Sequence, residues 1–407
     1  MHGVSISNRT ELIMKLWQKG TEPDKEVEQF TVGEDYILDQ QLVKYDCLAS
    51  MAHARMLNKI NIISVQECDR LIAVLQEIVD LDAQGKFKIK QSDEDCHTAI
   101  ENYLTKKLGE TGKKIHTGRS RNDQVLTALR LFYRDAIDEI MSQLSNLSEA
   151  FSKLKQNFGS IPLPGFTHTR KAMPSSVEMW SQAFIDAIAD DQILIKTIRI
   201  IVNQSPLGTA AGYGVPLPLD REFTAKELGF DKVQQNPVYT QMSRGKFETM
   251  ILHALSQVLY DLNRCATDMI FLSIPEWDIF KLPDSYCTGS SIMPQKMNPD
   301  ILELIRSDYH VINGYQVLVQ NINANLITGY HRDIQNSKGP VLKAFKITND
   351  SISILSSLIG NTKINADKAK AQMTEELYAT EKAYKLVKQG IPFREAYRQV
   401  AKEIFKK

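Results

Sequence analysis

Apolar residues recur along much of the chain at the spacing of an α-helix. From Phe247 they follow the helical period without a break, at positions 247, 250, 251, 254, 255, 258, 259 and 262. A second run extends from Val125 to Leu154, at 125, 129, 132, 136, 137, 140, 144, 147, 151 and 154. A β-strand cannot produce this pattern, because its side chains alternate with a period of two. The sequence therefore predicts helices over both stretches.

These helices are long. The second run predicts a helix that begins near Asn122 and lasts past Phe151, a rod on the order of 50 Å at about 1.5 Å per residue. A third helical pattern follows Pro174 and has apolar positions at 177, 180, 184, 188, 195, 198 and 202. Two more helical stretches are expected at about 299–324 and 340–360. Alternating strand patterns are scarce, so the predicted fold class is all-α, an elongated bundle of long helices.

The same patterns predict three domains. Residues 1–110 hold shorter helices and polar turns, 111–360 hold the long helices, and 361–407 form a short, reduced C-terminal helical domain. Long helices with apolar flanks need partners, and one chain supplies only a few, so we expect an oligomer in which other copies cover those flanks. The alternative is a monomeric bundle with shorter, bent helices.

Composition excludes several classes of function. The chain has 49 basic and 49 acidic residues among 407, so it lacks the basic field that binds nucleic acid or an anionic membrane. Its five cysteines form no CxxC pair, which fits reduced thiols in a cytoplasmic protein without a structural zinc site. The stretch Met1–Gly20 lacks the apolar core of a signal peptide, and no run approaches the ~20 apolar residues of a membrane span. These features indicate a protein that acts on a small molecule.

Three polar loops carry candidate chemistry. The first is Cys287-Thr-Gly-Ser-Ser-Ile-Met-Pro-Gln-Lys-Met-Asn-Pro299, between two helical patterns. Its small residues let the loop move and bring backbone N–H groups close to a ligand, and its lysine and asparagine offer donors to a carboxylate. The alternative interpretation is an ordinary connector rich in turns.

The other two loops interrupt the long helices. Lys114-Ile-His-Thr-Gly-Arg-Ser-Arg-Asn-Asp-Gln-Val125 precedes a helix N-terminus and offers an anion site of N–H groups and guanidinium forks. A helix cap with surface arginines is the alternative. Pro164-Gly-Phe-Thr-His-Thr-Arg-Lys-Ala-Met-Pro174 carries one histidine between two threonines. A histidine in such a loop is either a proton-transfer group or a structural residue.

Together these loops resemble the fumarase and aspartase superfamily, and within it the argininosuccinate lyase family. Gly289-Ser-Ser-Ile-Met-Pro-Gln-Lys-Met-Asn-Pro299 matches the signature loop of the whole superfamily. His116-Thr-Gly-Arg-Ser-Arg-Asn-Asp-Gln124, preceded by Asp93-Glu-Asp-Cys-His-Thr98, resembles the argininosuccinate lyase branch in particular. The resemblance runs from about Leu16 to the end and includes Thr328-Gly-Tyr-His-Arg-Asp-Ile-Gln-Asn-Ser-Lys338.

The resemblance implies a reversible β-elimination that splits argininosuccinate into arginine and fumarate, with no metal or organic cofactor. It also implies a homotetramer around a central helix bundle, with each active site built from three chains. A sister lyase acting on adenylosuccinate, aspartate or malate would share the Gly-Ser-Ser loop but not the Arg-Ser-Arg-Asn-Asp run. A non-catalytic structural relative is the other alternative, although it would tolerate loss of the catalytic residues that this chain retains.

By motif position, the resemblance assigns the chemistry to the first and third loops. Ser290 would be the catalytic base, and its alkoxide would need strong stabilisation because a serine hydroxyl is a poor base at neutral pH. His168 would orient the substrate or relay a proton to the leaving nitrogen, and Thr167 would bind a carboxylate. Lys296 and Asn298 would hold the carboxylate that accumulates charge.

The remaining assignments concern substrate binding. Asn122 and Arg121 would bind the succinyl end, and Tyr330, Gln335 and Lys338 would lie around the arginine portion. The chain also departs from the family pattern. Gly33 stands where the family has a substrate-binding serine, Thr169-Arg170 replaces Leu-Gln, and Ser243-Arg-Gly-Lys246 replaces Ser-Asp-Arg-Asp.

Overall fold

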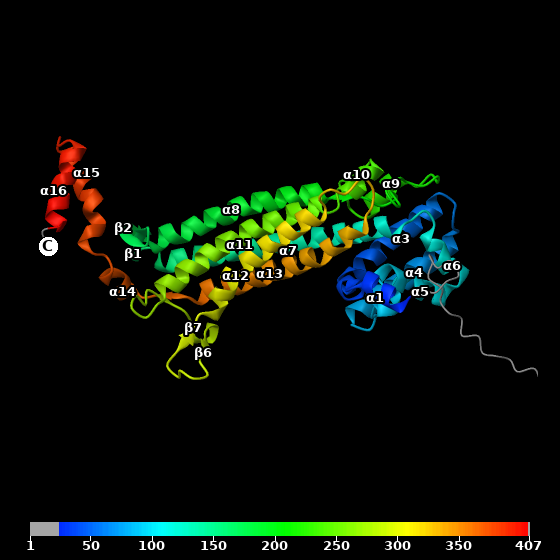
Figure 1. Cartoon of the computed structure of the whole chain (residues 1–407), viewed down its shortest axis with the longest axis horizontal. Coiled ribbons are helices and arrows are strands. Elements are labelled where there is room, and N and C mark those ends of the chain that lie inside the picture. Colours follow the sequence, from blue (N-terminus) through cyan, green and yellow to red (C-terminus); the bar gives the residue numbers. More distant parts are fainter. Residues whose placement is uncertain (1–23, 406–407) are drawn as a thin grey trace, which may run out of the picture. The chain divides into compact units, whose positions relative to one another are not determined.

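The computed structural model describes residues 24–405 (Figure 1). The expectation for Met1–Gly20 lies outside the described residues. The fold has two compact units, and the chain passes between them more than once. The first unit holds the described residues up to 133 together with 203–244 and 327–331, and the second holds 134–202, 245–326 and the residues from 332 onward. The three predicted domains divide the chain by sequence and remain a prediction.

Short helices form the N-terminal part of the first unit. Helix α4 begins with a capping box, in which the Ser64 hydroxyl accepts the N–H of Glu67 and the Glu67 carboxylate accepts the N–H of Ser64. Helix α3 packs against both α4 and α5. The elements are α1 (Lys25–Val32), α2 (Asp35–Leu38), η1 (Asp39–Leu42), α3 (Val43–Lys59), α4 (Val65–Ala83), η2 (Gln91–Asp93), α5 (Cys96–Leu108), α6 (Glu110–Lys113) and η3 (Lys114–His116).

Residues 203–244 complete the first unit. Strand β3 (Gln204–Ser205) pairs in parallel with β4 (Lys232–Val233), and helices α9 (Arg221–Glu227) and α10 (Pro237–Met242) flank them. One apolar core joins this segment to helices α3 and α7 (Arg121–Phe158). It is made of Ala49, Ala52, Leu131, Leu207, Ala225, Leu228, Phe230 and Val233. The segment therefore folds with the N-terminal helices although some 90 residues separate it from α5.

Long helices form the second unit and agree with the predicted ones. Helix α11 is central and packs against α8, α12 and α13, which lie side by side in Figure 1. Helix α7 starts in the first unit and continues into the second. The bounds are α7 (Arg121–Phe158), α8 (Val177–Val202), α11 (Lys246–Leu272), α12 (Asp300–Ile322) and α13 (Lys338–Asn361). The all-α fold class is confirmed.

Aromatic side chains of α7, α8 and strand β5 (Phe280–Lys281) pack against one another. Phe151 of α7 stacks on Phe184 at 5.3 Å between ring centroids, and Trp180 packs edge-on against Phe280 at 4.9 Å. Such pairs add about 0.5–1.5 kcal/mol beyond their buried area. The Trp180 indole N–H donates to Asp268 on α11 at 3.0 Å, so the polar tip of this ring is also satisfied.

Short elements cap this bundle. Strands β1 (Pro162–Thr167) and β2 (Arg170–Ser176) form a hairpin, and β5 (Phe280–Lys281) pairs with β8 (Lys363–Ile364). Strands β6 (Thr288–Gly289) and β7 (Met297–Asn298) also pair, and η4 (Asp284–Tyr286) precedes them. The C-terminal part contains η5 (Arg332–Ser337) before α13, then α14 (Ala366–Ala371), η6 (Glu375–Tyr378), α15 (Ala379–Lys388) and α16 (Phe393–Phe405).

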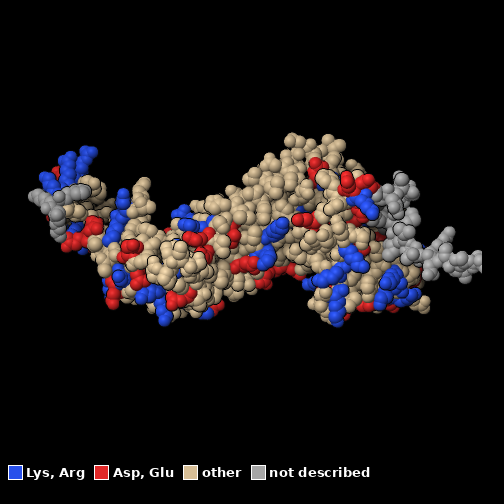
Figure 2. All heavy atoms as spheres, turned by 60° about the horizontal axis from the view of Figure 1, so that its bottom comes forward, with Lys and Arg blue, Asp and Glu red and all other residues tan. Residues whose placement is uncertain are grey.

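Surface charge is mixed on the face drawn in Figure 2, where basic and acidic side chains are interspersed. This distribution agrees with the balanced composition of 49 basic and 49 acidic residues. Within residues 24–405, no helix combines the length and the apolar character that a membrane crossing requires.

Candidate functional site

Residues 287–299 form a small hairpin, here called the lid. Two residue pairs close it, Thr288 with Asn298 and Gly289 with Met297. Ser290 follows the first strand, and its Oγ accepts the backbone N–H groups of Met293 at 3.0 Å and Ile292 at 3.4 Å. Donors aimed at an oxygen favour its negatively charged form. The lid therefore already supplies part of the stabilisation that an alkoxide at Ser290 would need.

Lys296 and Asn298 of the lid line a hollow with a volume of about 760 Å³. Its other walls include Phe280 and the charged residues Lys281 and Glu303. The Lys296 ammonium and the Asn298 amide are donors that suit a carboxylate. Ser290, Lys296 and Asn298 thus share one short segment, but Ser290 is not among the described residues that line this hollow.

Cys287 also lines this hollow but does not qualify as a nucleophile. Burial raises the pKa of its thiol, and the nearby carboxylates of Asp284 and Asp300 raise it further. The reactive form of cysteine is the thiolate, so a raised pKa keeps this side chain inert at neutral pH.

His168 and Thr169 occupy the tip of the β1–β2 hairpin. Thr167 pairs with Arg170, so the loop has two residues, and both have positive φ, 53° and 57°. Positive φ at both central positions is typical of the tight turn that matches the twist of a hairpin. The sequence suggested only a loop held by prolines, because neither tip residue is a glycine.

The body of this hairpin is fixed and its tip is exposed. Phe166 packs against Phe271 and Trp277, each at 5.2 Å between ring centroids. The Lys171 ammonium donates to the carbonyl of Gln372 at 2.8 Å. Within the described part of the chain, no hydrogen bond joins the His168 imidazole to Ser290 or Lys296. His168 is an exposed residue at the tip of this hairpin.

Arg121 begins α7 and is held by partners inside the first unit. Its guanidinium donates to Glu94 at 2.9 Å and to the Thr98 hydroxyl at 2.7 Å, and it lies 3.4 Å from Asp95. Burial opposes its charge, but the carboxylates of Asp95 and Glu94 raise the pKa of Arg121 overall. Residues 93–98 therefore have a physical role next to the arginine-rich motif, because their side chains hold Arg121, which directly precedes Asn122.

Asp123 is a residue that sequence reasoning left without a role. Its fully buried carboxylate accepts three backbone N–H groups, from Ser120 at 2.9 Å, Gly208 at 3.0 Å and Ala210 at 2.9 Å. Burial raises its pKa, and these hydrogen bonds oppose the rise. Asp123 therefore ties the start of α7, with Asn122, to a loop nearly 90 residues away. Its place beside Asn122 in the motif was the one available signal.

The third group of predicted residues is divided between the units. Tyr330 belongs to the first unit, where the Arg244 guanidinium lies 5.0 Å from its ring centroid. Gln335 lies in η5 and is half-buried, and Lys338 is the buried first residue of α13. The substrate roles of all three, and of Asn122, Arg121 and Thr167, remain predictions.

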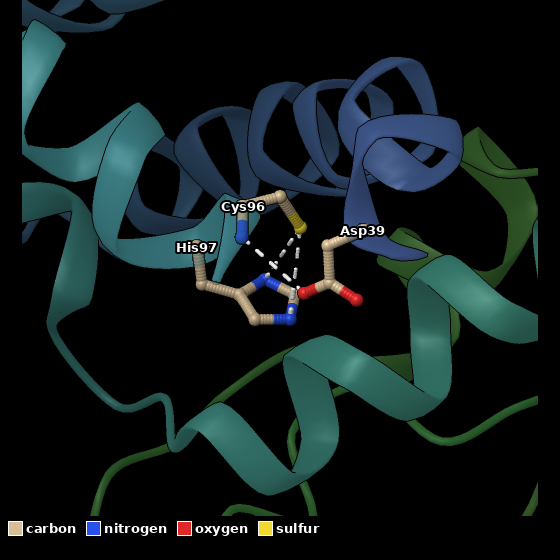
Figure 3. A group of neighbouring side chains, drawn as sticks. All are labelled: Asp39, Cys96 and His97. Carbon is tan, nitrogen blue, oxygen red and sulfur yellow. Dashed lines mark hydrogen bonds between the residues drawn. The ribbon is translucent and has the colours of Figure 1, made fainter. Parts of the chain in front are cut away.

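A separate buried cluster in the first unit contains Asp39, Cys96 and His97, whose side chains point toward one another in Figure 3. One potential ligand atom from each lies within 4.8 Å of the others. The Cys96 sulfur is 3.7 Å from His97 Nδ1 and 3.9 Å from Nε2. A metal bound by His97 would lie along the lone pair of one ring nitrogen. The Cys96 sulfur is nearly equidistant from both nitrogens, so it is not placed to bind the same ion.

The carboxylates around His97 also argue against metal binding by this cluster. His97 Nδ1 lies 3.1 Å from Asp46 Oδ1. Burial would lower the pKa of His97, but the carboxylates of Asp46, Asp95 and Asp39 outweigh it and raise that pKa. A raised pKa favours the imidazolium form, which offers no lone pair to a metal. The cluster is therefore a buried ionic network that supports α5.

Comparisons with known proteins agree with the resemblance drawn from the motifs. A family model described as "Lyase" matches residues 18–314. An argininosuccinate lyase of Thermotoga neapolitana is 52% identical over 389 residues, which cover 96% of this chain and 98% of that relative. An argininosuccinate lyase of Sorangium cellulosum is 41% identical over 96% of this chain and 91% of its own length.

Solved structures give the same fold at lower identity. EDDS lyase in complex with formate superposes with a TM-score of 0.80 at 24% identity, over 95% of this chain and 77% of that one. A class II fumarase from Schistosoma mansoni gives a TM-score of 0.77 at 16% identity, over 92% of this chain and 91% of the fumarase chain. From the family match and the near full-length similarity of its relatives, the chain belongs to the argininosuccinate lyase family.

Proposed function

We propose that this protein is an argininosuccinate lyase, a carbon–nitrogen lyase that converts argininosuccinate reversibly into arginine and fumarate in arginine biosynthesis. The observation that carries the proposal is the 52% identity to the Thermotoga neapolitana argininosuccinate lyase over 96% of the chain. We further propose that it acts in the cytoplasm and uses no metal or organic cofactor, because proton transfer and electrostatic stabilisation suffice for the elimination.

Ser290 is the proposed base. It removes a proton next to one carboxylate of the succinyl group, and the resulting carbanion spreads its charge onto that carboxylate. The two N–H groups on Ser290 Oγ support this role, since they stabilise the oxygen after it loses its own proton. Lys296 and Asn298 would receive the doubly charged carboxylate, which is the group that most needs preorganised donors.

His168 is the proposed partner on the leaving-group side. It orients the substrate or passes a proton to the departing guanidinium nitrogen, and the adjacent Thr167 binds a carboxylate. The exposed tip of a firmly anchored hairpin supports this role, because its imidazole is free to meet a substrate held by another chain. Asn122 and Arg121 bind the succinyl end, and Tyr330, Gln335 and Lys338 surround the arginine portion.

The proposed assembly is a homotetramer whose active sites combine residues of several chains. Apolar side chains stay exposed along two of the long helices, and they would be covered by other copies. On α8 these are Met179, Ile193 and Ile200, and on α12 they are Leu304, Val311, Val317 and Leu318. A site assembled in this way also accounts for a His168 that makes no hydrogen bond to the lid of its own chain.

The test is fumarate release, followed by ultraviolet absorbance after adding argininosuccinate, adenylosuccinate or aspartate to separate samples. We expect fumarate only from argininosuccinate. Fumarate from adenylosuccinate or aspartate instead would identify a sister lyase, and no fumarate from any substrate would support a structural relative. A Ser290→Ala sample controls for contaminating enzyme.

A further inference from the structure

Tyr213 is a large side chain that the predicted mechanism does not use. It lies in the loop between β3 and α9, and 70% of its surface is exposed. The backbone around it is closed by two hydrogen bonds, because the N–H groups of Gly212 and Gly214 both donate to the carbonyl of Thr209 at 3.0 Å. The tyrosine therefore projects from a defined turn.

This turn is fixed relative to Asn122. The Asp123 carboxylate, one residue further along, accepts the N–H groups of Gly208 and Ala210. The turn also packs closely against α10, since a Cβ at Gly212 would lie 2.7 Å from Cγ of the buried Gln241. One carboxylate thus couples the position of the Tyr213 loop to the segment predicted to bind the succinyl end.

The other side of Tyr213 meets the segment that carries Tyr330. A Cβ added to Gly329 would lie 3.2 Å from the Tyr213 hydroxyl. The absence of a side chain at Gly329 leaves room for the phenol beside Tyr330. Tyr213 therefore lies among residues of one unit that come from three distant parts of the sequence, two of which carry predicted substrate contacts.

Tyr330 itself is already engaged by a cation of the protein. The Arg244 guanidinium lies 5.0 Å from its ring centroid, and Arg244 is only 8% exposed. One face of Tyr330 is thus taken by a buried internal guanidinium. The neighbouring Tyr213 offers an accessible aromatic ring instead.

We propose that Tyr213 is a specificity-determining residue for the arginine portion of the substrate, with its ring stacked on the substrate's guanidinium. This inference rests on the proposed function. A guanidinium is planar and weakly hydrated, so it stacks on aromatic faces more readily than an ammonium does. Binding of arginine, the product that carries the guanidinium, should therefore depend on Tyr213, whereas binding of fumarate should not.

The experiment uses the reverse reaction, in which arginine and fumarate are varied independently. We expect Tyr213→Ala and Tyr213→Leu to raise the KM for arginine by roughly 3- to 30-fold, the range of a cation–π contact. The KM for fumarate should stay within about twofold, and Tyr213→Phe should behave like the parent, because the ring and not the hydroxyl makes the contact. Tyr397→Ala, which removes a tyrosine 62% exposed on α16, is the matched control.

Binding of arginine alone, measured by titration calorimetry, gives a second readout that needs no turnover. The proposal is overturned if Tyr213→Ala binds arginine as tightly as the parent, or if it raises both KM values equally. It is also overturned if Tyr213→Phe is as weak as Tyr213→Ala, or if the parent binds no arginine. A parent that releases no fumarate from argininosuccinate but binds arginine through Tyr213 would refute only the proposed function.

Discussion

At the scale of single residues, Asp123 is the most consequential side chain outside the predicted set. A buried carboxylate is stable only when its oxygens are hydrogen-bonded, and here the donors are backbone N–H groups of two separate segments. Since backbone donors cannot rotate away, the side chain fixes both segments. The Asn122 segment and the Tyr213 loop thereby share one anchor.

Replacing Asp123 by asparagine tests this anchor. The amide oxygen of asparagine can still accept hydrogen bonds from the N–H groups of Gly208 and Ala210. The amide nitrogen then faces the N–H of Ser120, and because both groups are donors, that hydrogen bond is lost. We expect a loss of about 1–3 kcal/mol in the free energy of unfolding, measured with urea, and a raised KM for argininosuccinate. Asp123→Ala should lose more, because all three donors lose their acceptor.

A core variant provides the comparison. Leu75→Ala, on α4, removes a fully buried side chain and should cost about 2–5 kcal/mol without moving the loop. If it raises KM as much as Asp123→Asn does, the effect on KM reflects general destabilisation and the anchor has no specific role.

The motifs located several site residues in advance but could not reveal their contacts. Ser290, Lys296 and Asn298 lie within nine positions of one another, so local sequence sufficed to place them in one loop. Asp123 and Tyr213 depend on contacts across long sequence distances, and no local pattern encodes those. Arg121 was predicted to bind substrate, whereas its carboxylate partners Glu94 and Asp95 become apparent only in the folded chain.

At the scale of elements, the long helices were predictable because one apolar face persists over many turns. Helix α7 spans Arg121–Phe158, close to the predicted start near Asn122. The β1–β2 hairpin was not predicted, because its strands contain prolines and lack alternation, and its turn lacks glycine. Its pairing is set instead by the packing of Phe166 and the anchoring of Lys171.

The contact between α8 and α11 contains a carboxylate that should make stability depend on pH. Asp191 is 6% exposed, and its Oδ2 has no hydrogen-bond partner among the described residues. Burial, with the nearby charges of Asp261 and Asp190, raises the pKa of Asp191 to about 7. Because this value lies above that of the unfolded chain, the unfolded state releases the proton first, and stability falls as the pH rises from about 4 to about 7.

Asp191→Asn should remove this dependence. We expect little change in the free energy of unfolding near pH 4 and a gain of about 1–4 kcal/mol at pH 8, measured with urea at both values. Asp186→Asn changes an exposed position of the same helix and should have little effect at either pH. A gain of the same size at pH 4 would show that ionisation of Asp191 is not its cause.

At the scale of the whole molecule, composition and periodicity predicted a helical small-molecule enzyme but not its division into two units. Residues 203–244 and 327–331 join the N-terminal helices across long stretches of chain. Such contacts arise from core packing, for example of Leu207 and Phe230 with Ala49. A sequence read locally gives no sign of them.

Mixing two inactive variants tests the proposed shared sites. Ser290→Ala and His168→Ala should each lower kcat by about 10²- to 10⁴-fold, the usual contribution of a proton-transfer group. Refolded together, they should recover part of the activity, because some sites in a mixed tetramer receive both intact residues from different chains. Mass spectrometry of the intact assembly establishes that mixed tetramers form. Mixed tetramers without recovered activity would contradict sites built from several chains.

The lid is joined at its base by only two residue pairs, Thr288 with Asn298 and Gly289 with Met297. A ligand that orders the residues between them must offset their conformational entropy, on the order of 1 kcal/mol per residue. This cost is the same for every ligand that orders the lid, whatever the ligand's size. A small ligand such as fumarate therefore loses a larger share of its binding energy than the full substrate does. The measured affinity for a part of the substrate, such as fumarate alone, will therefore be weaker than the contribution that this part makes to binding of the whole argininosuccinate.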